Sequence, residues 1–357
     1  MYKILLIAKL SDIKLTDKIM PLKEAFPNSE FYVLRRMKGP NIENVKYLTA
    51  PKFMENQKFL GTFYIFLKGI LSMFKLKPNF LISYFFIPHG IVSILISKIF
   101  KKKVICSIIG TDQLKFENNL FSNLYVNFLR KSDVIVVTGS KLKSKLESKI
   151  NTTNKIQIIP NSKKISIYHE GFEKREIDFL FVGGLIKLKQ VDVIIQAFNK
   201  MKKNNVSVTL YIVGDGPEKS NLQKLTYEYK IADKVIFTGY EKNVNIYFKK
   251  TKFIVLASQI EGLPSVLIEG MMNGCIPITT DVGDITDIVS QENGFLIEYK
   301  KNQKEKLIED LTNIFEHVIK MKPEIFEDYS NKNIEISKRY DYSYAGKLWL
   351  LILRKIL

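Results

Sequence analysis

The sequence predicts an α/β protein with two parallel β-sheets, each covered by helices. Short apolar runs alternate with helical patterns along the chain, and this alternation is typical of parallel sheets. The alternation breaks off near residue 160 and restarts near residue 177, and a length of 357 residues suits two domains. Hydrophobic residues make up 46% of the chain and charged residues 25%, which excludes a disordered or collagen-like protein.

We expect one doubly wound sheet in each half of the chain. The strands of the first sheet are predicted at residues 3–8, 30–34, 80–83, 103–107, 134–137 and 156–159. Those of the second sheet are predicted at residues 177–182, 208–213, 235–238, 253–256, 276–279 and 295–297. Between the two sets, the polar segment 160–176 begins with a turn signal and predicts a linker.

The last part of the chain predicts two further helices. A charged helix is expected at about residues 302–320, and the apolar run at residues 342–357 needs a surface to cover. We therefore predict a Rossmann-like first domain at residues 1–162, a Rossmann-like second domain at 163–340, and a final helix at 341–357 that returns to the first domain.

The cysteines and histidines exclude several kinds of site. Cys106 and Cys275 are too few for a disulfide framework or a four-cysteine zinc site. No two of the three histidines have the spacing of metal ligands, so no metal site is predicted. The first residues lack the layout of a signal peptide, and we expect a protein of the cytoplasm.

Positive charge is concentrated in the first half of the chain. Residues 1–170 hold 28 Lys and Arg against 11 Asp and Glu, whereas residues 171–357 hold 27 against 25. Between residues 56 and 111 there is no acidic residue, and this stretch contains Lys58, Lys68, Lys75, Lys77, Lys98, Lys101, Lys102 and Lys103. An apolar helical pattern over residues 59–74 suits a bilayer interface. The stretch therefore predicts docking on an anionic membrane surface.

Two alternatives to membrane docking follow from the same residues. A core helix with solvated lysines would also account for the pattern. Nucleic acid is not the expected partner, because the chain has no helix-turn-helix, zinc-finger or RNA-recognition signature. The apolar run at residues 78–97 is long enough for one membrane span, but Pro88, His89 and Gly90 interrupt it, which favours a strand, a turn and a buried helix.

Ligands of open α/β sheets bind at the carboxyl ends of the strands, so the loops at these ends are the first candidates for a site. The first such loop of the second half contains Gly183 and Gly184, with Lys187 and Lys189 a few residues later. Paired glycines let a ligand approach the backbone, and a lysine can neutralise a phosphate, although a plain tight turn would also use these residues. The next loop, at residues 213–217, is typical of a structural turn.

The most informative segment is EGLPSVLIEG at residues 261–270. Leu263 and Pro264 predict an extended residue followed by the start of a helix. The first N–H groups of that helix, near Ser265, favour a diphosphate. Glu269 lies one turn further on the same face, where its carboxylate could bind a ribose diol, and Glu261 lies in the loop on the other side of the diphosphate. An ordinary capped helix with two solvated glutamates is the alternative.

With these motifs in order, the chain resembles glycosyltransferase family 4, retaining enzymes of the GT-B fold that use nucleotide sugars without a bound metal. The resemblance covers most of residues 177–297, through FVGGLIKLK, GDGP, VIFTGY, EGLPSVLIEG, NGCIPITTDVGDITDIV and ENGFLI. Weaker matches in the first half are IGTDQL, SDVIVVTGSKLKSKL and IQIIPNS. The resemblance implies two Rossmann-like domains that face each other across a cleft, the first for the acceptor and the second for the nucleotide sugar.

The resemblance also implies roles for individual residues. Glu261 and Asp112 would be catalytic residues, with Glu261 near the donor sugar. The residues expected to bind the nucleotide sugar are Gly183, Gly184, Lys189, Gly239, Tyr240, Gly262, Leu263, Pro264, Ser265 and Glu269. Among them, Glu269 would bind the ribose, Lys189 the phosphates, and the base would lie near Tyr240. At the end of a predicted strand, His89 is a candidate for binding the acceptor.

Three positions depart from the family pattern. No arginine follows the glycines of the first loop, so Lys187 would have to take its place. Ile109 stands where many members have histidine. The segment AKLSDIKLT after the first strand lacks the glycines that the family has there.

The function that the resemblance implies is retaining transfer of a sugar to a glycan or lipid-linked acceptor at the inner face of the cell membrane. The expected donor is a UDP-sugar, and no cofactor is expected. A non-catalytic nucleotide-sugar-binding protein and a sugar-nucleotide epimerase are the alternatives.

Overall fold

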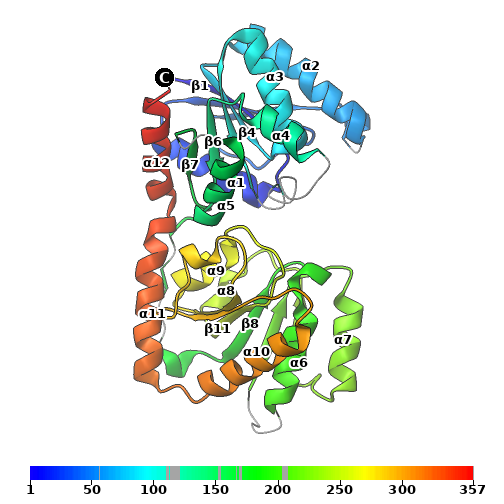
Figure 1. Ribbon diagram of the computed structural model, residues 1–357, viewed down its shortest axis with the longest axis vertical. Helices are drawn as coiled ribbons and strands as arrows, with labels where there is room; N and C mark the ends of the chain where they lie inside the picture. The colour runs from blue at the N-terminus through cyan, green and yellow to red at the C-terminus, as the bar shows by residue number, and fades with distance from the viewer. Residues whose placement is uncertain are drawn as a thin grey trace. The chain divides into compact units, whose positions relative to one another are not determined.

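The computed structural model describes residues 1–55, 57–109, 112, 121–151, 154–165, 167–168, 171–202 and 208–356. The chain divides into two compact units, one formed by residues 1–164 together with 341–357 and the other by residues 165–340 (Figure 1). Each unit is built on one parallel β-sheet, and the predicted α/β class is confirmed. The matched segment IGTDQL lies outside the described residues except for Ile109 and Asp112, and the side chain of Lys58 is also outside them.

The sheet of the first unit has seven strands in the order β3-β2-β1-β4-β5-β6-β7. The strands are β1 (Lys3–Ala8), β2 (Glu30–Arg35), β3 (Val45–Thr49), β4 (Phe80–Tyr84), β5 (Lys103–Ser107), β6 (Val134–Val137) and β7 (Ile156–Ile158). The sequence predicted all of these strands except β3. That strand was missed because it lies at the edge of the sheet and is not fully buried on either face. After β1 the chain adds β2 and β3 on one side of it, and β4 to β7 follow on the other side. The direction in which strands are added therefore reverses between β1 and β4.

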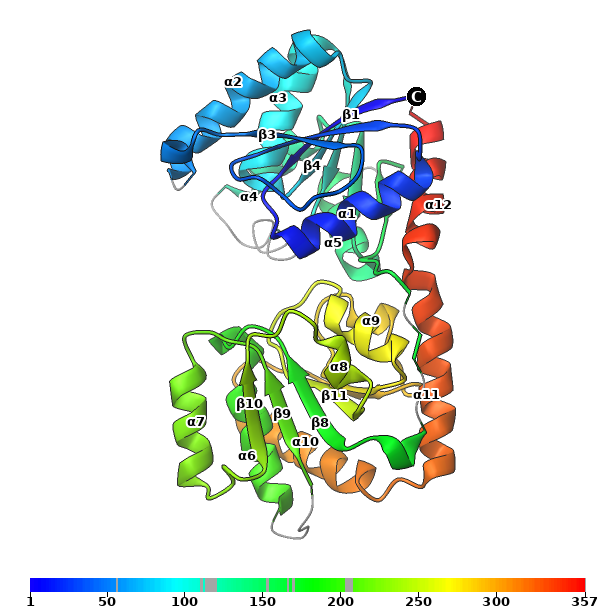
Figure 2. The same cartoon turned by 180° about the vertical axis from the view of Figure 1, so that it is seen from behind.

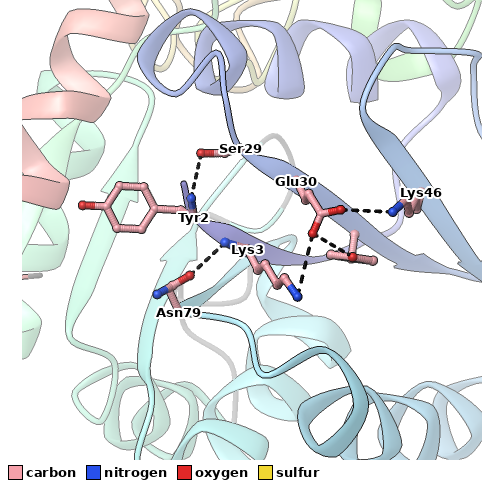
Figure 3. Close-up of polar contacts among 7 residues, drawn as sticks. Tyr2, Lys3, Ser29, Glu30, Lys46 and Asn79 are labelled. Carbon is pink, nitrogen blue, oxygen red and sulfur yellow. Dashed lines mark hydrogen bonds and ion pairs between the residues drawn. The ribbon is translucent and has the colours of Figure 1, made fainter.

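Polar contacts at the amino ends of the strands fix the register of this sheet (Figure 3). Lys3 pairs with Glu30 in the β1 and β2 ladder, and the Lys3 N–H donates to Oδ1 of Asn79 at 2.8 Å. The carboxylate of Glu30 accepts hydrogen bonds from the Lys46 ammonium at 3.1 Å and the Tyr32 hydroxyl at 3.1 Å. Ligands of open α/β sheets bind at the opposite edge, at the carboxyl ends of the strands.

Helices cover both faces of the first sheet. They are α1 (Asp12–Ala25), α2 (Lys58–Leu76), α3 (Ile91–Phe100), α4 (Ser122–Leu129), α5 (Ser140–Ile150) and α12 (Tyr342–Arg354). Apolar side chains of α1 and α12 form one core with the sheet, and those of α2 to α5 form the core on the other face. The C-terminal helix α12 packs against α1 (Figure 2), and its Trp349 is buried in their shared core, as the need of residues 342–357 for a surface predicted.

The second unit has six strands in the order β10-β9-β8-β11-β12-β13 (Figure 2). The strands are β8 (Ile177–Val182), β9 (Leu210–Val213), β10 (Val235–Gly239), β11 (Thr251–Leu256), β12 (Ile276–Thr280) and β13 (Phe295–Ile297). The helices are α6 (Val191–Lys202), α7 (Lys219–Glu228), α8 (Asn245–Phe248), α9 (Ser265–Met272), α10 (Lys304–Val318) and α11 (Pro323–Ser337). One continuous apolar core joins the sheet to these helices.

The segment expected to be a linker belongs in part to the second unit. The Phe172 ring packs edge-on against Phe326, with ring centroids 5.2 Å apart. The Arg175 guanidinium is buried and donates hydrogen bonds to the carbonyl groups of Thr251 and Asn273. The prediction of a polar linker over residues 160–176 is therefore wrong for its last residues, because a charged side chain satisfied by two carbonyl groups can be buried.

The apolar residues of 58–100 form two helices and a strand. The run at residues 78–97 is strand β4, a short turn at Phe86–Gly90 and helix α3, as the interruption at Pro88 predicted. Helix α2 differs from α3. By length and composition, its segment Phe59–Leu76 is long and apolar enough to cross a membrane, and 28% of that segment is buried. The buried side includes Ile65 and Met73, which pack on the first unit.

Candidate functional site

The candidate site of the second unit lies at the carboxyl ends of β8 and β11. These strands are neighbours in the sheet, but the chain continues from β8 toward one edge and from β11 toward the other. Such a reversal leaves a crevice between the loops, where ligands bind in open α/β sheets. The loop after β8 carries the glycine pair and Lys189, and the loop after β11 carries Glu261. The backbone joins them, because the Gln259 N–H donates to the Leu188 carbonyl at 2.9 Å.

Lys189 and Glu261 form an ion pair across this point. The Lys189 ammonium donates to Oε1 of Glu261, and the Ser258 hydroxyl donates to the same oxygen at 2.7 Å. The Lys189 side chain is 25% exposed and that of Glu261 11% exposed, so both lie near the surface without being fully solvated. Two predicted site residues are thus brought together, and Ser258, which sequence reasoning missed, holds one of them in place.

The glycines after β8, β9 and β10 allow close packing of the loops. A Cβ on Gly214, whose φ is +145°, would lie 1.9 Å from the Gly183 carbonyl oxygen. The Gly214 N–H in turn donates to the Gly239 carbonyl at 2.8 Å. Gly184 is different, because a Cβ there would meet nothing within 4 Å. Gly214 therefore has a packing role in the loop at residues 213–217, whereas Gly184 leaves open space next to its backbone.

Helix α9 begins immediately after the loop that contains Glu261. Pro264 precedes the helix in an extended conformation, with ψ of 117°, and Ser265 is the first helical residue. The expectation that Pro264 is the first helical residue is therefore wrong by one position. Among the described residues no side chain caps this helix, and Leu263 is buried beneath its start. Glu269 lies one turn into α9 and is partly exposed.

The loop after β12 supports the segment that carries Glu261, and sequence reasoning gave it no role. Gly283 has a φ of +59°, and a Cβ there would lie 2.1 Å from the Glu261 carbonyl oxygen. The Asp284 N–H donates to the Gly262 carbonyl at 3.1 Å, and the Thr280 hydroxyl donates to the Ser258 carbonyl at 2.7 Å. A glycine in the loop after a predicted strand was the available signal, since glycine readily adopts a positive φ.

Three further residues were predicted for this site, Gly239, Tyr240 and Lys187. Gly239 ends strand β10 with a φ of +80°, and the Tyr240 ring that follows is 70% exposed, so it is free to stack on a base. Lys187, expected to replace an arginine, is exposed and lines an adjacent cavity of about 480 Å³ together with Gln190 and Lys304. It is not bonded to Glu261 as Lys189 is.

Asp112 and His89 lie together in the first unit. Asp112 is buried, and its Oδ2 accepts a hydrogen bond from the Phe86 N–H at 2.8 Å, at the start of the turn Phe86–Gly90 that contains His89. The contact makes Asp112 a residue that positions this turn. His89 is 3% exposed, and its carbonyl accepts a hydrogen bond from the Ser93 hydroxyl at 2.8 Å. Burial, with Arg36 and Lys9 nearby, lowers the pKa of His89 to about 4.

The described residues hold no cluster of metal ligands. Within the described ranges, no three His, Cys, Asp or Glu side chains are grouped so that they could hold a metal ion. The two cysteines are buried, and burial raises the pKa of each thiol to about 12. They therefore have the character of small apolar core residues.

The paired parallel-sheet units define the GT-B fold, and solved structures of that fold match the whole chain. The structure of Anabaena Alr3699/HepE in complex with UDP has a TM-score of 0.79 and 16% identity, covering 99% of this chain and 100% of that one. At this identity the likeness shows the fold alone.

Residues 162–331 match the family described as Glycosyl transferases group 1. The second unit is therefore similar in sequence to these glycosyl transferases. Similar curated proteins include N-acetyl-alpha-D-glucosaminyl L-malate synthase of Bacillus anthracis, 26% identical over 226 residues, which are 59% of each chain. Another is N-acetylgalactosamine-N,N'-diacetylbacillosaminyl-diphospho-undecaprenol 4-alpha-N-acetylgalactosaminyltransferase of Campylobacter jejuni, 27% identical over 191 residues, 51% of this chain and 52% of that one. The chain spans between about half and three fifths of these relatives.

Proposed function

We propose that this protein is a retaining glycosyltransferase that moves a sugar from a UDP-sugar to a glycan or lipid-linked acceptor. The observation that carries the proposal is the pairing of Lys189 with Glu261 at the chain reversal of the second sheet, directly beside the start of α9. The complex of HepE with UDP and the named acceptors of the Campylobacter jejuni relative support the choice of donor and of a lipid-linked acceptor.

The proposed chemistry uses the charges of this site. When the bond between sugar and diphosphate breaks, negative charge grows on the diphosphate and positive charge on the anomeric carbon. The Lys189 ammonium and the first N–H groups of α9 would stabilise the diphosphate. Glu261 would stabilise the anomeric carbon, or attack it as a carboxylate nucleophile, and Glu269 would bind the ribose hydroxyl groups. No resident cofactor or metal takes part in the proposed reaction.

We also place the protein on the inner face of the cell membrane through the surface of α2 and α3. Six apolar side chains on α2 are at least 44% exposed, namely Phe59, Leu60, Phe63, Leu67, Leu71 and Phe74. On α3, Leu95 and Ile99 are exposed as well. Since Ile65 and Met73 on the opposite side of α2 pack on the sheet, the helix fits an interface better than a span across the bilayer.

Lysines lie on α2 and α3 and directly after their last residues. Lys68, Lys75, Lys77, Lys98, Lys101 and Lys102 form no ion pair with any residue that the structure describes. Each basic residue near an anionic leaflet contributes about 1 kcal/mol to binding, and the apolar side chains add burial. Charge and apolar surface together favour reversible docking on anionic lipid.

The experiment that tests the transferase proposal measures UDP release. The full chain is incubated with a panel of UDP-sugars, with and without a membrane extract as the source of acceptor. We expect release that depends on the extract, persists in EDTA, and is lost in Glu261→Ala and Glu269→Ala but kept in Glu228→Ala on α7. NMR of the product gives the anomeric configuration, and retention is expected. UDP binding without release would instead indicate a non-catalytic protein, and release without acceptor would contradict transfer.

A further inference from the structure

The first unit contains a cavity of about 630 Å³ at the carboxyl ends of its strands. Residues 8–12 after β1, residues 35–37 after β2, Glu55 and His89 line it. Strands β2 and β4 flank β1, and the chain reverses its direction across the sheet between β1 and β4. The cavity therefore occupies in the first sheet the same kind of position that Lys189 and Glu261 occupy in the second, where open α/β sheets bind ligands.

The basic side chains that line the cavity differ in how far other residues already bind their charge. Arg35 is buried and already neutralised, since its guanidinium contacts Oδ1 of Asp12 at 3.0 Å and the Leu10 carbonyl at 3.0 Å. Lys9 is exposed at the cavity and has no hydrogen bond or ion pair with any part of the chain that the structure describes. An ammonium group in such a position is available to an anion.

Arg36 is the second cation, and helix α2 helps to hold it. Its guanidinium donates to the Thr62 hydroxyl at 3.3 Å, in the first turns of α2. A Cβ on Gly61 would lie 2.8 Å from Nε of Arg36, so the glycine leaves room for the arginine. One wall of the cavity is thus tied to the helix that carries the exposed apolar side chains.

His89 supplies a buried polar group with unused hydrogen-bonding capacity. Its Nδ1 is buried and has no partner among the described residues, although His89 lines the cavity. A buried nitrogen without a partner costs free energy, and a ligand that hydrogen-bonds to it recovers that cost. Since its pKa is low, the ring is neutral near pH 7 and can donate through one nitrogen only.

We propose that this cavity binds a phosphate or diphosphate group of the acceptor, with Lys9 and Arg36 as its charge partners and His89 as a hydrogen-bond donor. The inference rests on the proposed function in taking the anion to be part of the acceptor. The attachment of Arg36 to α2 places the anion next to the surface proposed to dock on the membrane, as a phosphate attached to a lipid requires.

The test is a titration of the full chain with inorganic pyrophosphate, with UDP in excess so that the diphosphate site of the second unit is filled. The chain has only 3 histidines, so ¹⁵N spectra of the imidazole groups are simple, and His89→Gln assigns the His89 signal. We expect pyrophosphate to shift the His89 resonances. Lys9→Gln should weaken pyrophosphate binding by about tenfold or more, because a charge-assisted hydrogen bond is lost.

Lys38→Gln is the matched control, since Lys38 is exposed close by in the sequence and does not line the cavity. It should bind pyrophosphate as the wild type does. A short-chain polyprenyl phosphate and a soluble sugar 1-phosphate, titrated in parallel, distinguish a lipid headgroup from a free phosphate ester. The proposal is overturned by unshifted His89 resonances, or by equal affinities of Lys9→Gln and wild type for pyrophosphate. It is also overturned if L-malate, titrated in the same way, binds to the chain and pyrophosphate does not. Because the titration involves no turnover, its outcome is independent of the UDP-release experiment.

Discussion

The Lys189 ammonium donates a hydrogen bond to Oε1 of Glu261, although 72 residues separate the two in the sequence. The contact exists because β8 and β11 are neighbours in the sheet while the chain leaves them in opposite directions. It fixes two opposite charges where a donor with a negative diphosphate and a developing positive sugar would need both. The pair therefore links the topology of the second unit to the proposed chemistry.

The first prediction concerns Lys189. Lys189→Gln should lower kcat/KM for sugar transfer by about 100-fold, because a charge that stabilises the leaving diphosphate is removed. UDP release measures the effect. Lys224→Gln on α7 removes an exposed lysine from the same unit and should leave the rate within about threefold. A Lys189→Gln enzyme with the wild-type rate would show that the diphosphate does not use this lysine.

The second prediction compares two glycines. Gly184→Ala should leave the unfolding free energy within about 0.5 kcal/mol, because the new Cβ meets no atom within 4 Å. It should still weaken UDP binding by about tenfold, since the methyl group occupies the space next to the loop. Gly283→Ala should destabilise the protein by about 2 kcal/mol or more, because φ is +59° and the Cβ would lie 2.1 Å from the Glu261 carbonyl.

Thermal unfolding with and without UDP separates the two effects. Gly184→Ala should unfold at the wild-type temperature without UDP and gain less from added UDP. Gly283→Ala should unfold at a lower temperature in both conditions. Equal stabilisation of wild type and Gly184→Ala by UDP would exclude this loop from the donor site.

The strands were predictable where both faces of the sheet are covered. Strands such as β1 and β4 are continuous apolar runs, because helices pack on both sides of them. Strand β3 carries the exposed Lys46 as its second residue and lies at the sheet edge, so its sequence does not show an apolar run. Helix α11 was missed for a related reason, because charged residues cover much of its surface between a few buried positions.

The residues of the site were predictable individually, but their contacts were not. The spacing of Glu261 and Glu269 is a local pattern and can be read from one segment. The pairing of Lys189 with Glu261 depends on which strands are neighbours, and so does the support of the Glu261 carbonyl by Gly283. The cavity around His89 likewise needs the ends of β1, β2 and β4 to be placed side by side. Such information lies in the topology, which short sequence patterns do not contain.

The third prediction tests membrane docking. The wild type should sediment with phosphatidylglycerol vesicles at low salt and less so at high salt. The double variant Phe59→Gln, Phe63→Gln should bind at least about tenfold more weakly, because the two rings are 84% and 55% exposed and lose their burial in the bilayer. The charge variant Lys75→Gln, Lys101→Gln should mainly reduce the dependence of binding on salt.

The control for docking removes equally exposed apolar groups elsewhere. Tyr227 on α7 and Leu351 on α12 are 72% and 57% exposed, so Tyr227→Gln, Leu351→Gln changes a similar apolar area. It should bind vesicles as the wild type does. If both double variants lose binding equally, or if the wild type does not bind at all, the surface of α2 and α3 is not a membrane interface.

The fourth prediction is a pH dependence of stability that originates in His89. The pKa of His89 is lowered from 6.5 to about 4 in the folded protein, chiefly by burial. Between these two values the unfolded chain binds more protons than the folded chain, so the unfolding free energy falls as the pH falls through this window. From pH 7.5 to pH 5 this histidine should account for a loss of about 2 kcal/mol.

Comparison with His89→Gln isolates that contribution, because the acidic residues titrate equally in both proteins. Urea unfolding at pH 7.5 and pH 5 should show a smaller loss in the variant than in the wild type, by about 2 kcal/mol. Filling the cavity with pyrophosphate should reduce the wild-type loss as well, if the anion stabilises the protonated ring beside Arg36 and Lys9. The same loss in both proteins would mean that the His89 ring becomes charged without cost, and hence that it is solvated rather than buried at the cavity.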